Sequence, residues 1–412
     1  MLSRLEIAQQ LDREDPLFEL RHLFHIPAQT VYLDGNSLGP LSYSAQERIA
    51  QTTQQEWGND LIASWNKHSW ISKPQQVGDR IGKLVGASEG QTLCCDSISI
   101  NLFKVLVAAL EVFPGDTIVS TEDNFPTDLY MIQGLQKLLE ERNIKLELVA
   151  ENELENALSR DVAALLVTHV NFRTGAMLNI ERLAQLAHKN NAAIIVDLAH
   201  SAGAVPVYLD DWQVDFAVGC TYKYLNAGPG APAFVYVAER HLGKAYQPLF
   251  GWMGHAAPFE FSPEYVPAQD ISQFLVGTPP IVSMSAVEGA LDVFEQTSIP
   301  ALREKSVKLS EAFEQALAEK GLNQELQSIS PTDSNVRGSQ LSFHHEDAYA
   351  ICQAWIHSGV IADYRAPSYL RVGFAPLYVG FEDLFVAIEK LEHIMRNKTY
   401  KEAQFQVKQK VT

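Results

Sequence analysis

The stretch ALLVTHVNFRTGAMLNIERLAQLAHKNNAAIIVD (residues 164–197) decides the fold of this chain. It opens with the apolar run 164–170 and closes with the apolar run 193–197, and neither run alternates polar with apolar residues. Such runs are typical of strands buried on both faces of a parallel sheet. Between them, residues 179–190 carry apolar side chains at helical spacing. The stretch therefore predicts a β-α-β unit.

The same alternation of strand and helix patterns continues on both sides of this unit. Three further runs that lack polar alternation predict strands buried on both faces, and they lie at 92–95, 117–120 and 145–149. Two more strands are predicted at 216–220 and 233–237, and a helix over 100–113. The alternation of strands and helices predicts a doubly wound α/β domain with a mostly parallel sheet.

A chain of 412 residues is long enough for a large domain and a smaller one. From Pro280 a helical run leads through 298–300 into a second long helix. Strand patterns then alternate with helices, at 339–345, 360–364 and 369–375. We expect a large domain over 46–295 and a smaller α/β domain over 296–412. Residues 1–45, which begin with an amphipathic helix, are expected to pack on the smaller domain or on a neighbouring subunit.

Composition and charge exclude several classes of protein. The formal net charge of −18 disfavours a nucleic acid or an anionic membrane as a partner. No apolar run is long enough to cross a bilayer, and the N-terminus lacks the apolar core of a signal peptide, so we expect a cytoplasmic protein. The four cysteines form no C-x-x-C pair, which indicates buried, reduced thiols rather than a metal site.

Two charged residues, Asp197 and Lys223, indicate the kind of cofactor chemistry that the chain could carry out. Asp197 ends an apolar strand, so it lies at the carboxyl edge of the sheet, where open α/β sheets bind ligands. Lys223 follows on a loop between two strands, with a tyrosine on each side. A strand-end acid and a loop lysine are what pyridoxal 5'-phosphate (PLP) chemistry requires, because the lysine forms an imine and the carboxylate keeps the pyridine nitrogen protonated. A helix N-cap is the alternative role for Asp197, and a solvated charge is the alternative for Lys223.

The cofactor phosphate needs backbone N–H groups at a helix N-terminus. Residues 96–99, Asp-Ser-Ile-Ser, lie between the strand at 92–95 and the next helix, so they supply that geometry together with hydroxyl donors. Capping of the helix by Ser97 or Ser99 is the alternative interpretation, and both roles are compatible.

At this point the sequence resembles a known family. The segments DLAHSAG, TYKYLNAGPGAPAF, GWMGH, NFPTD, LDGNSLG and YLRVGFAPLY are similar to kynureninases, which are fold-type I PLP enzymes of the class V aminotransferase group. The similarity extends from Leu33 to about Val379, and its most specific part is YKYLNAGPG followed by GWMGH. The resemblance implies hydrolysis of L-kynurenine, and of 3-hydroxykynurenine, to anthranilate or 3-hydroxyanthranilate and L-alanine. It places the enzyme in the kynurenine pathway of tryptophan catabolism and NAD biosynthesis.

The resemblance also assigns roles to residues. It implies Lys223 as the covalent cofactor lysine, Asp197 as the partner of the pyridine nitrogen and Tyr222 as a proton carrier. Further cofactor contacts implied within one chain are Ile98, Ser99, Phe125, Asp128 and His200. In a homodimer with shared sites, Trp252 and Thr278 reach over from the other subunit. The implied substrate contacts are Asn36, Ser37, His68, His255 and Arg371; an arginine suits a carboxylate because its planar fork binds both oxygens.

Alternatives remain for these roles. Arg371 fits a structural ion pair, and Phe125 and Trp252 fit core aromatics. Another class V enzyme, such as a cysteine desulfurase or an aminotransferase, would share the lysine and the aspartate. A non-catalytic regulator with the same fold is a further alternative, but it would have little reason to keep Lys223, Asp197 and an arginine together. A desulfurase needs a reactive cysteine, whereas Cys220 and Cys352 lie in apolar patterns. The Gly277–Thr278 pair resembles bacterial kynureninases that favour kynurenine.

Overall fold

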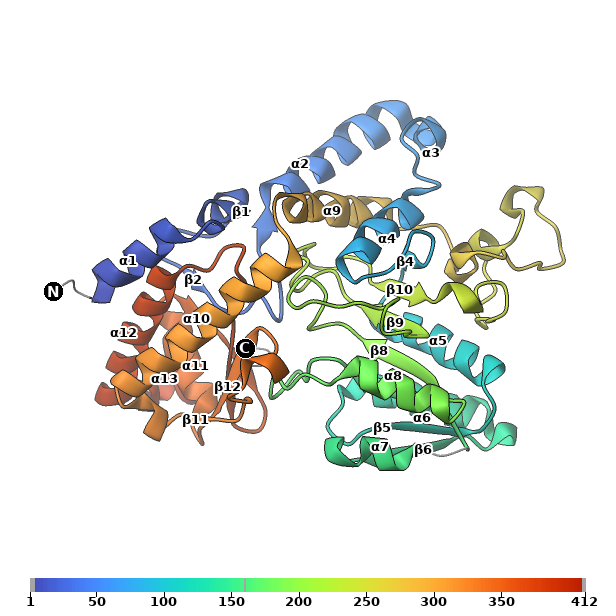
Figure 1. Cartoon of the computed structure of the whole chain (residues 1–412). Helices are drawn as coiled ribbons and strands as arrows, with labels where there is room; N and C mark the ends of the chain where they lie inside the picture. Colours follow the sequence, from blue (N-terminus) through green and yellow to red (C-terminus); the bar gives the residue numbers. More distant parts are fainter. Residues whose placement is uncertain (1–3, 159–160, 410–412) are drawn as a thin grey trace.

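A computed structural model of the chain describes residues 4–158 and 161–409. Its central feature is a seven-stranded sheet in the order β4-β10-β9-β8-β7-β5-β6 (Figure 1). All strands are parallel except β10. The bounds are β4 (Thr92–Cys94), β5 (Thr117–Thr121), β6 (Lys145–Val149), β7 (Val162–Thr168), β8 (Ala193–Asp197), β9 (Phe216–Gly219) and β10 (Phe234–Val237). The predicted mostly parallel sheet is confirmed.

Helices cover both faces of this sheet, because alternate side chains of its central strands point into two different cores. Leu165 and Val167 of β7 belong to one core, and Ala164 and Leu166 belong to the other. The helices around the sheet are α4 (Lys73–Leu84), α5 (Ile98–Val112), α6 (Pro126–Leu138), α7 (Leu154–Ala157), α8 (Ile180–Lys189) and α9 (Ile281–Leu291). The doubly wound arrangement is therefore confirmed.

One predicted strand is not buried as expected. β6 lies at the edge of the sheet and pairs only with β5, so the expectation that residues 145–149 are buried on both faces is wrong. Lys145 and Glu147 are exposed, and Leu148 is 39% exposed. An edge strand has one neighbour, which leaves part of its surface to solvent.

The C-terminal part is built on a four-stranded antiparallel sheet in the order β11-β12-β15-β14. Its strands are β11 (Gln327–Ser328), β12 (Gln340–His344), β14 (Asp363–Arg365) and β15 (Tyr369–Gly373). Its helices are α10 (Ile299–Glu319), α11 (Ala348–His357), α12 (Phe381–Asn397) and α13 (Ala403–Gln406). The strand predicted over 360–364 is divided between β14 and the short β13 (Val360–Ile361).

The N-terminal segment packs on this C-terminal part. Helix α1 (Arg4–Glu14) lies against α12, where Asp12 accepts hydrogen bonds from the backbone N–H groups of Phe381 (2.6 Å) and Glu382 (2.9 Å). Strand β2 (Val31–Tyr32) pairs with β13, and β1 (Phe24–His25) pairs with β3 (Leu41–Ser42). The domain boundaries at 45 and 295 stay predictions.

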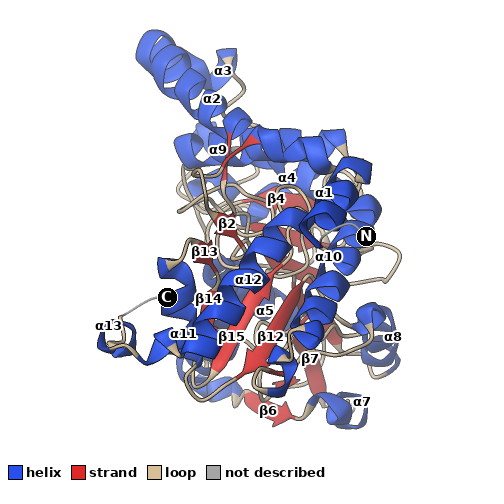
Figure 2. Cartoon of the chain, turned by 90° about the vertical axis from the view of Figure 1, so that its left-hand side faces the viewer, coloured by secondary structure: helices blue, strands red, loops and turns tan. Residues whose placement is uncertain are grey.

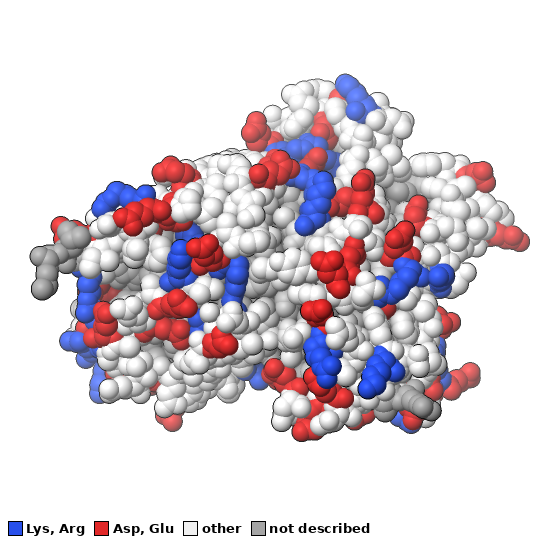
Figure 3. All heavy atoms as spheres, viewed as in Figure 1, with Lys and Arg blue, Asp and Glu red and all other residues white. Residues whose placement is uncertain are grey.

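An arm stands away from the body of the molecule (Figure 2). Helix α2 (Tyr43–Gln51) packs on α9 and continues as a π-helix over Thr52–Asp60, after which α3 (Ser64–Lys67) turns back. Within residues 4–158 and 161–409, no helix has the length and apolar character needed to span a membrane. On the face drawn in Figure 3, acidic and basic side chains are interspersed, without a continuous basic patch.

Candidate active site

The carboxyl ends of β5, β7, β8 and β9 open on a cavity of about 210 Å³, which the N-terminus of α5 also lines. Ligands of open α/β sheets bind at this edge. The predicted site residues that line it are Ile98, Ser99, Phe125, Asp197, His200, Tyr222 and Lys223. The structure thus brings together residues from four separate segments. Thr127, Thr168 and Phe172 also line the cavity and were missed from the sequence.

Lys223 lies on the predicted loop after β9 and reaches into this cavity. Its Nζ is 3.0 Å from His200 Nε2 and 5.9 Å from the ring centroids of Phe125 and Tyr222. Burial lowers the pKa of Lys223, and it lowers the pKa of His200 well below its usual value. The surroundings therefore favour a neutral amine, which is the nucleophilic form of lysine.

Asp197 ends β8 as predicted and is 2% exposed. Its Oδ1 accepts a hydrogen bond from the backbone N–H of Ala199 at 2.7 Å, which closes a turn; no helix begins at residues 198–204, so the alternative of a helix N-cap is wrong. Burial raises the pKa of Asp197 to about 6, against the effects of the Ala199 N–H and the Lys223 charge. Nearby Asp128 is fully buried, and its pKa is raised well above the usual value by burial and by Asp197. A cation beside these two carboxyl groups would stabilise their charged forms.

The N-terminus of α5 provides donors on the opposite side. Ser97 caps the helix by accepting from the backbone N–H of Ile100 at 3.4 Å. Ser99 Oγ lies 2.8 Å from Thr127 Oγ1, so two hydroxyl groups meet where the first helical N–H groups are exposed. Hydroxyls and a helix N-terminus together bind phosphate well.

The predicted carboxylate binders also meet. Arg371 on β15 is 1% exposed, and its Nη2 donates to Ser37 Oγ at 3.0 Å. The side-chain oxygen of Asn36, with its amide turned toward the arginine, accepts from Nε at 2.8 Å and from Nη2 at 3.1 Å. Arg371 also donates to Asp363 and to the carbonyl of Phe172. The alternative of a structural ion pair is thus also correct for Arg371.

Comparisons with known proteins were made over the whole chain. A sequence profile of the kynureninase C-terminal domain matches residues 302–391. A kynureninase of Burkholderia pseudomallei (strain 1106a) is 46% identical over 413 residues, covering 99% of both chains. A kynureninase of Pseudomonas fluorescens is 44% identical over 408 residues, covering 98% of both chains.

The chain belongs to the kynureninase family. Solved structures support the fold of this kynureninase family member at lower identity. A cysteine desulfurase of Thermococcus onnurineus superposes with a TM-score of 0.77 at 19% identity, over 92% of this chain and 98% of that one. The Escherichia coli cysteine desulfurase CsdA gives 0.77 at 17% identity, with the same coverage. Such likeness shows the shared fold alone.

Among the described residues, no cysteine is placed to act as the nucleophile that a cysteine desulfurase needs. All four cysteines are free and buried, as expected. Burial raises the pKa of Cys220 and, more strongly, that of Cys352. Cys220 lines the Lys223 cavity but is 3% exposed, and Cys352 is fully buried, so neither is the exposed thiolate that a desulfurase needs.

Eight residues that the kynureninase resemblance implied do not line the Lys223 cavity within this chain: Asn36, Ser37, Asp128 and Arg371, described above, and the four that follow. Trp252 is 42% exposed, on a short helical turn, and Thr278 is exposed in the loop before α9. His68 Nε2 lies 2.7 Å from Asp60 on the arm. His255 Nε2 lies 3.1 Å from the carbonyl of Glu264. The structure therefore places these four outside the cluster.

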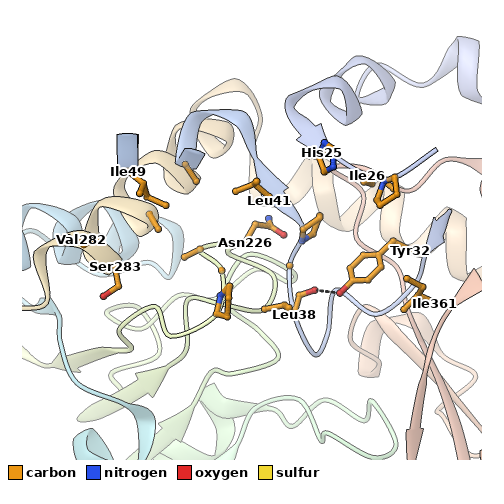
Figure 4. A pocket seen from close by; sticks show the side chains of 18 of the residues that line it. His25, Ile26, Tyr32, Leu38, Leu41, Ile49, Asn226, Val282, Ser283 and Ile361 are labelled. Atoms are coloured by element: carbon orange, nitrogen blue, oxygen red, sulfur yellow. Dashed lines mark hydrogen bonds between the residues drawn. The ribbon is translucent and has the colours of Figure 1, made fainter. Parts of the chain in front are cut away.

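A larger groove of about 920 Å³ lies on the other side of the Lys223 loop (Figure 4). Its walls are the N-terminal segment from His25 to Ile49, the loop 226–229 and the start of α9. The turn that carries Asn36 and Ser37 packs directly on the Lys223 loop, because the N–H of Gly39 donates to the carbonyl of Tyr222 at 2.8 Å. A Cβ on Gly39 would lie 2.5 Å from the Lys223 carbonyl, so only glycine allows this approach.

Proposed function

We propose that this chain is a PLP-dependent hydrolase that converts L-kynurenine to anthranilate and L-alanine. The observation that carries the proposal is the meeting of Lys223 and Asp197 in one strand-end cavity, with Arg371 hydrogen-bonded to the carbonyl of Phe172 in its wall, in a chain that is 46% identical to a kynureninase over 99% of its length. An amine, an acid and a carboxylate-binding arginine serve three separate parts of this reaction.

The residues present fit PLP. Asp128, whose Oδ2 accepts from the cavity-lining Thr168 at 3.4 Å, has a buried Oδ1 without a hydrogen-bond partner among the described residues, so an unpaired acceptor lies next to the cavity. Phe125 and Ala199 line the cavity and offer apolar surfaces to an aromatic ring. Lys223 would bind the aldehyde carbon, Asp197 the ring nitrogen, and Ser99 with the N-terminus of α5 the phosphate. When bound, PLP supplies an electron sink for bonds broken at the substrate's Cα.

The side chains around the bound cofactor would carry out substrate binding and the proton transfers. Arg371, with Asn36 and Ser37, binds the α-carboxylate and so fixes the Cα–H bond within reach of Lys223. The Lys223 amine, whose pKa burial lowers, would take the Cα proton and later return a proton to the same carbon as alanine forms. Water adds to the aryl ketone, which allows the Cβ–Cγ bond to break. The electron pair of that bond stays on Cβ while the departing carbon leaves as the anthranilate carboxyl group. Tyr222, whose phenol is kept protonated because burial raises its pKa, would deliver the proton to Cβ.

An assay of the purified, PLP-loaded protein tests this function. L-Kynurenine should yield anthranilate and alanine in equal amounts, and 3-hydroxykynurenine should be cleaved at a lower kcat/KM. Release of sulfur from cysteine, or transfer of the kynurenine amino group to a keto acid without cleavage, would contradict the proposal.

We further propose a homodimer with shared sites. Phe250, Trp252, Phe259 and Phe261 are each at least 42% exposed, and the rings of Trp252 and Phe259 lie 5.8 Å apart, so they form an exposed aromatic patch. Exposed patches of this kind mark interfaces. The apolar groove of Figure 4 also begins just after Thr278, at Pro280, which suits coverage by a second copy.

Mixing two inactive variants tests whether each active site is shared between the two subunits. A heterodimer of Lys223→Ala and Trp252→Ala subunits holds one site in which both wild-type residues meet, provided they come from different chains. Activity should then reappear, although each homodimer alone is nearly inactive. Exchange of subunits is verified by mass. Complete exchange without recovered activity would place Trp252 in its own chain's site or core.

A further inference from the structure

Arg365, the last residue of β14, lies beside Arg371. Its Nη2 donates to Ser37 Oγ at 3.2 Å, and the Nη2 of Arg371 donates to the same oxygen at 3.0 Å. Its Nε is 3.0 Å from Asp363 Oδ2, which also pairs with Arg371. Two guanidinium groups thus share a serine hydroxyl and a carboxylate.

The charges in this cluster favour an additional anion. Asp363 is 2% exposed and supplies one negative charge against the two arginines. Asp34 is the other nearby acid, and burial together with the charge of Asp363 raises its pKa to about 7. A large fraction of Asp34 is therefore uncharged at neutral pH, which leaves a positive excess in a poorly solvated place. Buried charge of one sign is costly unless an opposite charge pairs with it.

Arg365 has more capacity for a ligand than Arg371. Arg371 is 1% exposed and donates to four protein groups. The Arg365 side chain is 37% exposed and has one hydrogen bond, to Ser37, within the described residues. Burial has the largest effect on the pKa values of Lys223, which is lowered, and Tyr222, which is raised, and the charge of Arg365 acts on both as a smaller contribution toward lower values.

We propose that Arg365 is a second guanidinium for the substrate's α-carboxylate, which it binds together with Arg371 and Ser37. This assignment rests on the proposed function, because it takes an amino acid as the ligand. In this arrangement Arg371 is held in place by the protein, and Arg365 completes the contact as the anion arrives. A purely structural arginine, paired only with Asp363, is the competing explanation.

Two ligands that differ in the carboxylate separate these explanations. We would measure binding to the PLP-loaded protein by calorimetry for 4-(2-aminophenyl)-4-oxobutanoate and for 2'-aminopropiophenone, which lacks the carboxylate. Arg365→Gln should weaken binding of the acid at least about tenfold, as expected for one charge-assisted hydrogen bond, and change binding of the ketone less than about twofold. Retained ketone binding also shows that the variant is folded.

Arg240→Gln is a matched control. Arg240 is also 37% exposed and pairs with a buried acid, Asp215, at 2.7 Å, but it belongs to a separate ion-pair cluster, with His188 and His241, that contains neither Arg371 nor Ser37. It should leave binding of both ligands unchanged. Should Arg365→Gln fail to fold, Arg365→Lys replaces it, and binding of the acid alone should weaken by several-fold, because an ammonium cannot reproduce the planar fork.

Equal effects of the Arg365 variants on acid and ketone, or no effect on either, would overturn the assignment. So would a wild-type protein that binds the acid no more tightly than the ketone. Turnover of L-kynurenine is measured separately. Its absence would refute the proposed reaction and leave the comparison of the two ligands valid, since that comparison needs only binding.

Discussion

Replacement of Asp197 by asparagine tests the acid at the end of β8 in isolation. An asparagine oxygen can still accept the hydrogen bond from the Ala199 N–H, so the local fold should persist. The cavity loses a carboxylate that is 2% exposed and gains an amide N–H group in its place. Opposite charges in contact, at an effective dielectric constant near 20, interact by about 4 kcal/mol, which corresponds to about a thousandfold in rate. We therefore expect kcat to fall between about a hundredfold and a thousandfold.

The assay follows anthranilate fluorescence at saturating L-kynurenine, with the PLP content of each preparation measured after alkaline release. Normalising to bound cofactor separates loss of chemistry from loss of binding. Thermal unfolding of the variant serves as the control for folding. A variant that retains full cofactor and has kcat within about threefold of wild type would refute the role of Asp197 as the partner of the ring nitrogen.

Three further predictions follow from the same cavity. Lys223→Ala should show no turnover and no borohydride-reducible link to the cofactor; a native link at another lysine would contradict the assignment. In the folded apoprotein the pKa of Asp197 is about 6, whereas in the unfolded chain it is 3.8. The unfolded chain therefore loses this proton more readily, and the free energy of unfolding decreases as the pH rises from about 4 to about 6. Asp197→Asn should therefore gain about 3 kcal/mol in unfolding free energy relative to wild type between about pH 4 and pH 8, measured with denaturant, and a constant difference would refute this. Arg371→Lys should lower kcat/KM at least about tenfold because the planar fork is lost, and a KM close to that of wild type would be the opposing result.

Most strands of the large sheet could be predicted from the sequence, because whether a segment forms a buried strand depends largely on its own run of apolar residues. The strand predicted at 193–197 has those bounds in the structure, and the helices predicted at 100–113 and 179–190 begin and end within two residues of the observed ones. The exposure of β6 did not follow, because KLELV carries no sign of how many neighbours the strand has. The edge position depends on the order of strands in the finished sheet.

The site residues also fall into two groups, those that could be predicted from the sequence pattern and those that could not. Asp197 and Lys223 were found from strand ends and loops, whereas Asn36, Ser37 and Arg371 required the family resemblance, since more than 300 residues separate them. Arg365 and Thr127 were missed altogether. Arg365 stands in an unremarkable strand pattern, and only the shared contact with Ser37 reveals it. Thr127 lay within NFPTD, and its position next to Phe125 was the available signal.

The turn at residues 33–39 has a consequence for how the protein is made. Ser37 of this turn is synthesised 334 residues before its partner Arg371. All the strands that surround Lys223 are complete by Val237. Contacts between such distant positions form late in folding, because a long loop must close first. We therefore expect a nascent chain to acquire the means of holding its cofactor well before it can recognise an amino acid, so that specificity is the last property to appear.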